Sequence, residues 1–511
     1  MKRGWLLIVP AIGVALTICL SNAFGPFWVG PNYDPEYVYL VNSLGILEGH
    51  APVHTDHPGT PLQLLGAGVI ATVHLLTDAK SDLARSVLSN PEKYLGCIRA
   101  VLVALWVVAT IMIGLAAAGL TGSALCAMLV QAAPLMSLQG ALSLTRASPE
   151  PLLLIISILI GTLALNRSGP VFSPNQSRRD SIRVGGLLGI GVATKVTFFP
   201  VGAFCLLCVR NTRARVVVTI AAITAFVVAV SPIFTRWSSV FRWFGKLVLG
   251  TETYGEGPRT VINPTSYSRG LVTLLGAEPL LFVLAALSFA TWIGLRRARD
   301  LRPENHARLS VALLGVALAE LLQIAITAKY PVPRYMVPAI GLAGLNVGLL
   351  WQALHEAMPT SRRRAAKVAF TVAALAAGVF QAYRVSTTAQ MLSRRRDEAI
   401  RLTDIANRIP NRVLAFGYGS SGEGAALWFA NTWARNRYSP LLEELHPRTV
   451  EFHLGWKVFL RHGVVVPQSQ IDEWTRRGKL VVQMNESNLP SAMRLEPIAR
   501  TGFETLGRVV R

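Results

Sequence analysis

The chain has 511 residues, of which 52% are apolar and only 15% charged, and its formal net charge is +22. These values exclude an ordinary soluble domain and indicate a polytopic membrane protein. Cytoplasmic loops and contacts with anionic membrane lipids account for the positive charge, so no nucleic-acid partner is expected.

A series of apolar segments has the length and composition of membrane-embedded helices. The segment 183–208 has basic residues at both ends and a polar break at Ala193-Thr194-Lys195, so it is expected to enter the membrane and return as two short helices. The sequence thus predicts an α-helical polytopic protein with about eleven transmembrane helices, the N-terminus inside and the C-terminus outside. The segments are about 4–24, 95–119, 122–139, 149–165, 183–208, 216–234, 271–294, 309–327, 336–354 and 368–388.

Basic clusters between these segments predict the orientation in a bacterial inner membrane, since Lys and Arg are retained on the cytoplasmic side. The segment 61–77 is short and carries Gln63 and His74, so it is interpreted as an interfacial helix. This interpretation puts Asp34, His57, Glu150, Lys195 and Arg334 on the outer, periplasmic side. The clusters are Arg167, Arg178, Arg179 and Arg183; Arg210, Arg213 and Arg215; Arg296, Arg297, Arg299, Arg302 and Arg308; and Arg362, Arg363, Arg364 and Lys367.

The first predicted outer loop is acidic and rich in histidine. No Lys or Arg occurs between Gly4 and Ala79, a stretch that contains Asp34. Pro35 follows and favours the first turn of a helix, in which residues from Tyr37 onward form an apolar stripe on the membrane surface. The helix N-terminus keeps the Asp34 carboxylate ionised, as a general base requires. A plain helix-capping role explains the position equally well.

A second constellation lies at Thr145–Pro151, where Ser148 is positioned to cap a helix that begins at Pro149. Glu150 falls in the first turn of that helix. A charge at the head of a membrane helix is costly unless it is paired or functional, although capping alone also accounts for it. Arg146 is either the partner of Glu150 or an anion-binding residue.

Lys195 interrupts a continuous apolar segment, and an intramembrane lysine is by default a functional hypothesis. The alternative is a lysine that extends to the interface. Arg334, followed by Tyr335, joins two predicted spans on the same side. Lys195, Arg334 and Arg146 together predict a cationic pocket for a phosphate or diphosphate.

Other groups give weaker signals. His54, Asp56 and His57 are able to bind a divalent metal with Asp34 or Glu150, but their spacing matches no metal signature and structural roles are favoured. All five cysteines lie in apolar segments, which predicts no disulfides, and Cys205 and Cys208 are interpreted as buried thiols. The glycines of 417–422 are interpreted as a strand-to-helix turn rather than a phosphate loop.

The last part of the chain is polar. We expect residues 1–389 to form the transmembrane domain and residues 390–511 a small periplasmic α/β domain. Strands are predicted at 412–418 and 479–483, and helices at 423–433 and 449–460.

The order of these motifs resembles the GT-C superfamily of polyprenyl-phosphate-sugar-dependent glycosyltransferases, over about residues 5–350. The nearest branch is that of the protein O-mannosyltransferases and the bacterial aminoarabinose transferase that modifies lipid A. By this resemblance, Asp34 matches the catalytic acid of the first loop and Glu150 the acidic residue of the second. Lys195 and Arg334 match positions for the lipid phosphate. The chain departs from the family in having His57-Pro58-Gly59 for His-Pro-Pro and Glu150 for the common Asp.

The resemblance implies transfer of one sugar from a polyprenyl-phosphate carrier to a glycan, lipid or protein acceptor, with inversion. His57, Tyr335, Arg146 and Tyr37 are expected to complete the substrate site. No nucleotide cofactor is expected, because the lipid carries the activated sugar, and a divalent metal stays open. The rivals are a lipid or polysaccharide transporter and a non-catalytic assembly factor, for which Asp34→Asn would be silent.

Overall fold

The computed structural model describes residues 3–29, 36–166, 178–209, 211–250, 260, 262–297, 303–357, 360–416, 422–447, 449–453, 458–461, 464–484 and 494–510. It comprises two compact units. Unit 1 contains Met1–Ile18, Thr55–Leu62 and Ala100–Val385. Unit 2 contains Cys19–His54, Gln63–Arg99 and Ser386–Arg511. The domain boundary predicted at residue 389 lies inside one unbroken helix, α17 (Thr360–Arg408).

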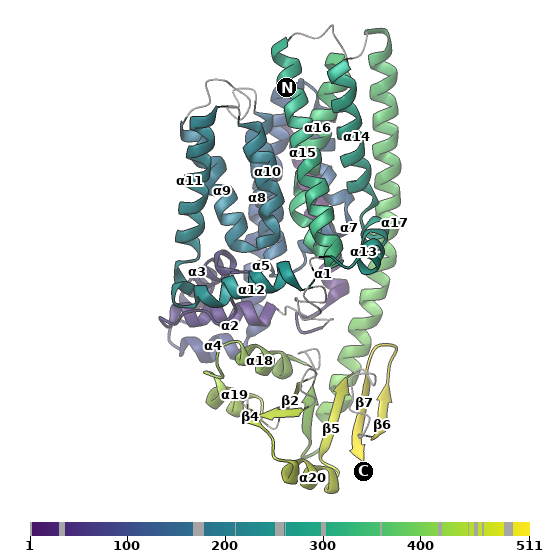
Figure 1. The fold of residues 1–511 in the computed structure, drawn as a ribbon. Helices are drawn as coiled ribbons and strands as arrows, with labels where there is room; N and C mark the ends of the chain where they lie inside the picture. The colour runs from purple at the N-terminus through teal and green to yellow at the C-terminus, as the bar shows by residue number, and fades with distance from the viewer. Residues whose placement is uncertain are drawn as a thin grey trace. The chain divides into compact units, whose positions relative to one another are not determined.

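Unit 1 is a helical bundle. Within it, α8–α11 and α14–α16 run along a common direction, and α12 lies across that direction (Figure 1). The elements are η1 (Arg3–Leu7), α1 (Ile8–Phe24), α5 (Pro91–Thr121), α6 (Ala124–Ala132), η2 (Ala133–Met136), α7 (Leu138–Ser143), α8 (Pro149–Leu165), α9 (Arg178–Thr194), η4 (Val196–Phe198), α10 (Phe199–Cys208), α11 (Thr212–Ala229), η5 (Ser231–Arg236), α12 (Trp237–Leu249), α13 (Pro264–Ala277), α14 (Pro279–Arg297), α15 (Pro303–Lys329), η7 (Pro333–Met336) and α16 (Val337–Ala357), with parts of α1, α5 and α17 belonging to unit 2.

Among the described residues, eight helices are long and apolar enough to cross a membrane, and three shorter helices are apolar. This confirms the predicted class of polytopic helical membrane protein, but it does not confirm the count of eleven. Helix α3 (Thr60–Thr77) is one of the eight, so its interpretation as an interfacial helix stays a prediction.

The predicted division of the segment 183–208 into two short helices is confirmed, because α9 and α10 are separated at Lys195, and its entry into and return from the membrane stays a prediction. Lys195 has the extended conformation φ −160°, ψ 131°, which ends α9. Helix α9 packs backbone to backbone on α11 through Gly185 and Gly189. A β-carbon would lie 2.3 Å from the Val218 carbonyl oxygen at Gly185 and 2.2 Å from that of Ala222 at Gly189. Only glycine permits this approach, as at small-residue interfaces of membrane helices.

A buried polar network joins α14, α15 and α16. Asn346 Nδ2 donates to both carboxylate oxygens of Glu320, at 3.0 and 2.9 Å, and Ser288 Oγ donates to Asn346 Oδ1 at 2.5 Å. All three side chains are fully buried. Because buried polar groups are costly unless paired, this network specifies how the three helices pack. It thereby fixes the α15–α16 connection, which carries Arg334.

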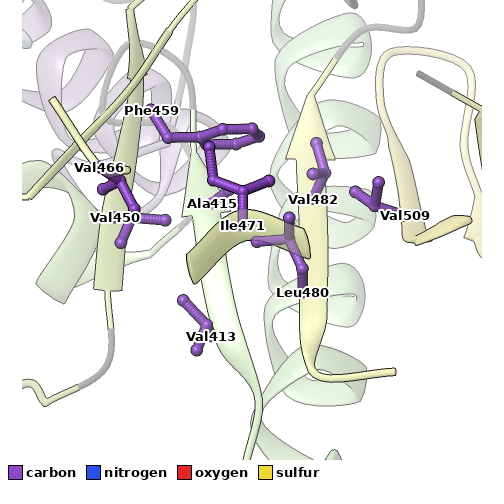
Figure 2. Packing of buried hydrophobic residues seen from close by; sticks show 9 residues of the cluster. All are labelled: Val413, Ala415, Val450, Phe459, Val466, Ile471, Leu480, Val482 and Val509. Carbon is purple, nitrogen blue, oxygen red and sulfur yellow. The ribbon is translucent and has the colours of Figure 1, made fainter. Parts of the chain in front are cut away.

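Unit 2 contains a seven-stranded sheet of order β4-β3-β2-β1-β5-β7-β6, in which β1 is parallel to β2 and β5 and the other pairs are antiparallel. Figure 2 shows the hydrophobic core on one face, where Ile471 of α20 packs over Ala415, Leu480 and Val482. The C-terminal α/β character is thus confirmed. The elements are α2 (Glu36–Leu47), α3, α4 (Leu83–Ser89), β1 (Val413–Phe416), α18 (Glu423–Thr432), α19 (Ser439–Leu445), β2 (Thr449–His453), β3 (Val458–Arg461), β4 (Val464–Val465), α20 (Gln468–Arg476), β5 (Leu480–Met484), β6 (Arg494–Arg500) and β7 (Thr505–Val510).

The helix predicted at 449–460 is wrong. Residues there form the antiparallel strands β2 and β3, with Glu451 opposite Leu460. Pairing with β1 decides the conformation, because Val450 then lies beside Ala415 in the buried core. The strand predictions at 412–418 and 479–483 and the helix at 423–433 are confirmed by β1, β5 and α18. Residues 417–421 of the predicted strand-to-helix turn lie outside the described part of the chain.

Helix α2 forms where an amphipathic helix on the membrane surface was predicted, but every residue from Glu36 to Gly45 is buried. Asn42 explains how its polar side is accommodated. Asn42 Oδ1 accepts the N–H groups of Val53 and His54 at 2.7 and 3.2 Å, and Asn42 Nδ2 donates to the Trp433 carbonyl at 3.2 Å. Residues distant in sequence therefore cover the polar side of α2, and the location of this helix on the membrane surface stays a prediction.

Candidate functional site

The centre of the candidate site in unit 1 is an ion pair between the first turn of α8 and the break after α9. Lys195 Nζ donates to Glu150 Oε1 at 2.8 Å, and the two side chains are 1% and 6% exposed. The pairing follows from the directions of the two helices, because the N-terminus of α8 and the C-terminus of α9 lie close together in space. An isolated buried charge is very costly, so each of these residues requires the other.

Tyr335 of η7 lies against two cations. Lys195 Nζ is 4.6 Å from the centre of its ring and the Arg334 guanidinium carbon 5.6 Å. Both distances are within the range of cation–π attraction. The structure therefore brings Glu150, Lys195, Arg334 and Tyr335 into one cluster, with Arg334 adding a half-buried positive charge beside the neutralised pair.

His57 completes this cluster. Its ring lies edge-on to Tyr335, with centroids 6.2 Å apart, and to Trp243 of α12, at 6.4 Å. Glycine at position 59 is required by the turn, because Gly59 has φ +68° and its N–H donates to the carbonyls of His57 at 2.7 Å and Ala193 at 3.1 Å. Through this bond the His57-Pro58-Gly59 turn is anchored to Ala193, which lies two residues before Lys195 in the sequence. We call Glu150, Lys195, Arg334, Tyr335 and His57 the Lys195 cluster.

Two supporting contacts were not predicted from the sequence. Gln323 of α15, fully buried, donates through Nε2 to the Tyr335 carbonyl at 2.7 Å and so holds η7 in place. Lys329 Nζ donates to the Leu247 and Val248 carbonyls at 2.9 and 2.6 Å, where the ammonium also complements the negative end of α12. The available signal for Gln323 was an amide inside an apolar segment.

The remaining predicted site residues are Arg146, Tyr37 and Asp34. Arg146 is half-buried in the turn between α7 and α8. Tyr37 is fully buried in unit 2 and its hydroxyl donates to Glu92 at 2.6 Å. Asp34 lies outside the described residues. The catalytic role of Asp34 and the binding roles of Arg146 and Tyr37 stay predictions.

Two further predictions concern the cysteines and a metal site. Cys205 and Cys208 are buried in α10 without a disulfide, as predicted. Among the residues that the structure describes, no three His, Cys, Asp or Glu side chains are grouped to hold a metal ion. A divalent metal that involves Asp34 stays a prediction.

No protein-family model and no curated protein matches the chain. Solved structures do. The crystal structure of ArnT from Cupriavidus metallidurans bound to undecaprenyl phosphate matches with a TM-score of 0.52 and 13% identity, over 99% of this chain and 98% of ArnT. The apo state of ArnT matches with a TM-score of 0.53 and 15% identity, over 99% and 97%.

A crystal structure of the Archaeoglobus fulgidus oligosaccharyltransferase with Zn and sulfate is more distant, with a TM-score of 0.46 and 13% identity over 89% of this chain and 68% of that chain. At such identities the similarity to ArnT shows the fold. The chain shares the fold of ArnT over nearly its whole length, which confirms the predicted fold class and the predicted resemblance.

Proposed function

We propose that the protein is a membrane glycosyltransferase that transfers one sugar from a polyprenyl-phosphate carrier to an acceptor hydroxyl or amine on the periplasmic face. The observation that carries the proposal is the Lys195 cluster, in which two cations converge on Tyr335 at one end of a GT-C helical bundle. The similar protein ArnT has been crystallised with undecaprenyl phosphate. A monoester or diester of phosphoric acid is the ligand that such paired cations favour.

In this proposal, Arg334 and Lys195 bind the phosphate that leaves the sugar. The bond between the anomeric carbon and the phosphate oxygen breaks, and the oxygen keeps the electron pair as a second negative charge on the phosphate. Preorganised cations stabilise charge that develops in the transition state. Glu150 already compensates most of the Lys195 charge, so Arg334 supplies the larger share of this stabilisation.

The acceptor attacks the anomeric carbon from the side opposite the phosphate, which inverts its configuration. Asp34 takes the proton that the acceptor loses. The contacts of Glu150 support a role in holding the Lys195 ammonium, and direct catalysis by Glu150 stays a prediction.

The test is the lipid-linked sugar profile of a strain that lacks the protein. Mass spectrometry of its membrane lipids should show one polyprenyl-phosphate-linked sugar in excess, and the wild-type gene should remove that excess. A gene with Arg334→Ala should not. An unchanged profile in the deletion strain would contradict the proposal, and accumulation of a finished glycan would favour a transporter.

A further inference from the structure

Unit 2 contains a cavity of about 370 Å³ at one edge of its sheet. Val413, the first residue of β1, and Val450 of β2 line it and belong to the buried core. Lys479, directly before β5, and Arg461, the last residue of β3, also line it. The cavity thus lies where the ends of four strands meet, and its volume is in the range of small-molecule sites.

Helix α20 supplies a polar wall of the cavity. Gln470, Glu473, Trp474 and Arg477 follow one another at the spacing i, i+3, i+4 and i+7, and all four line the cavity. This spacing places them on one face of the helix and its C-terminal end. Ile471 lies outside that face and packs into the hydrophobic core (Figure 2). One side of α20 therefore stabilises the fold, and another presents an amide, a carboxylate, an indole and a guanidinium to the cavity.

Two ion pairs contribute four of the charged groups. Arg461 Nη2 lies 2.5 Å from Glu443 Oε1, and Arg477 Nη2 lies 2.9 Å from Glu473 Oε1. A guanidinium has five N–H donors and a carboxylate about four acceptor positions, more than one ion pair uses. The wall therefore offers donors and acceptors next to one another. Such a wall suits the hydroxyl groups of a sugar, because each hydroxyl both donates and accepts.

Lys479 gives the cavity one positive charge in excess. Its backbone is fixed, because its N–H donates to the Trp474 carbonyl and its carbonyl accepts the Val413 N–H, both at 2.8 Å. Within the part of the chain that the structure describes, no carboxylate forms an ion pair with the Lys479 ammonium. A cavity that contains two balanced pairs and one further cation favours an anionic ligand.

We propose that this cavity binds a sugar ring that carries an acidic group, either a carboxylate or a phosphate. The acidic group pairs with Lys479, and the sugar hydroxyls bond to the two ion pairs. The half-buried indole of Trp474 gives the apolar side of the ring a flat contact. This inference goes beyond the proposed function, because the cavity lies within unit 2 and binding there requires no transfer reaction.

The experiment uses the purified full-length protein in lauryldimethylamine oxide, a detergent without a sugar headgroup. Calorimetric titrations with D-glucuronic acid, D-glucose-6-phosphate, D-glucose and inorganic phosphate compare the four ligands. A ligand of about 13 non-hydrogen atoms should bind with a Kd on the order of 1 mM. At least one acidic sugar should bind about 5-fold more tightly than D-glucose and inorganic phosphate, as expected for a half-exposed ionic contact. The tighter of the two acidic sugars identifies the acidic group.

Three variants test the assignment of the residues. Lys479→Ala should bind the acidic sugar only as weakly as the wild type binds D-glucose. Trp474→Phe keeps a flat ring, so it should still bind the sugar but lose the change in tryptophan fluorescence that binding causes in the wild type. Arg494→Ala removes an exposed cation of β6 and should bind as the wild type does. Thermal unfolding shows whether each variant is folded, and Lys479→Ala decides the question if Trp474→Phe unfolds.

Several results would overturn the proposal. One is that neither acidic sugar binds, and another is that D-glucose or inorganic phosphate binds as tightly as the acidic sugars. Equal losses in Lys479→Ala and Arg494→Ala would also overturn it, since they would indicate nonspecific attraction. Sugar binding and sugar transfer are measured separately, so failure of this inference and failure of the proposed function are distinguishable.

Discussion

The Lys195 ammonium and the Glu150 carboxylate form a nearly solvent-free ion pair although 45 residues separate them in the sequence. Lys195 was predicted to bind phosphate and Glu150 to be catalytic, but in the structure the two residues form one charged pair. Their energetics must be tested together, because removing either leaves the other charged and buried.

Single substitutions of this pair should be strongly destabilising. Glu150→Gln or Lys195→Met is expected to cost about 3–5 kcal/mol, whereas the double variant Glu150→Gln/Lys195→Met should recover most of that loss. Thermal unfolding of the purified protein in detergent measures both effects. The exposed pair Glu473–Arg477 is the control, since its removal should cost at most about 1 kcal/mol. Wild-type unfolding of the single variants would contradict the structural assignment.

Arg334 should contribute to binding without such a cost in stability, because its side chain is half-buried. A charge-assisted contact to phosphate is worth about 1.5–3 kcal/mol. Arg334→Ala should therefore raise the Kd for undecaprenyl phosphate by about 10- to 150-fold. Arg334→Lys should recover only part of the affinity, because lysine lacks the planar fork of donors. Arg213→Ala, at an exposed cation of unit 1, should bind normally; equal losses in both alanine variants would indicate nonspecific attraction.

The orientation of unit 1 is testable with two conservative cysteine substitutions. Ser239 is exposed on α12, and Ser361 is exposed at the start of α17, beside the last basic cluster. In a background with Cys19 and Cys97 replaced by Ala, an impermeant maleimide should label Ser239→Cys in intact cells and Ser361→Cys only after lysis. The reverse pattern would invert the predicted topology and place the Lys195 cluster at the cytoplasmic face.

The free energy of unfolding of unit 2 should decrease as the pH rises. Burial, and secondly the charge of Glu92, raises the pKa of Glu423 from 4.5 to about 7. The folded chain then holds a proton that the unfolded chain releases, so stability is full below about pH 4.5 and is lost as the pH rises to about 7. With partial exposure of the side chain, we expect a loss of about 1 kcal/mol. Glu423→Gln should flatten this slope between pH 5 and 8, and Glu496→Gln, at an exposed acid, should not; equal slopes would contradict the assignment.

The helical architecture was predictable because its signals are local. Apolar length marked most of the candidate membrane helices, and the polar break at Lys195 correctly marked the division between α9 and α10. Strand β2 was missed because its partner, β1, is more than thirty residues upstream, and β3 in turn pairs with β2. The packing of a distant strand overrode a local pattern that also fits a helix.

The site was predictable residue by residue but not as an arrangement. Lys195, Arg334 and Glu150 stand out as charges beside apolar segments, and the structure places them in one cluster. The sequence contains no signal that Glu150 neutralises Lys195, since the pair depends on the relative direction of α8 and α9. The contacts of Gln323 and Trp243 depend on the positions of η7 and α12 in the same way.

The glycine contact between α9 and α11 restricts how the ion pair can respond to a bound substrate. The Val218 and Ala222 carbonyl oxygens lie only 2.3 and 2.2 Å from where β-carbons of Gly185 and Gly189 would lie, so the two helix backbones are in direct contact there. Interiors packed at this density transmit a displacement rather than absorb it. Helix α9, which ends directly before Lys195, is therefore blocked from shifting toward α11. We expect an adjustment to a bound ligand on the other side of Lys195, at Arg334 and Tyr335 or at the Gly59 turn.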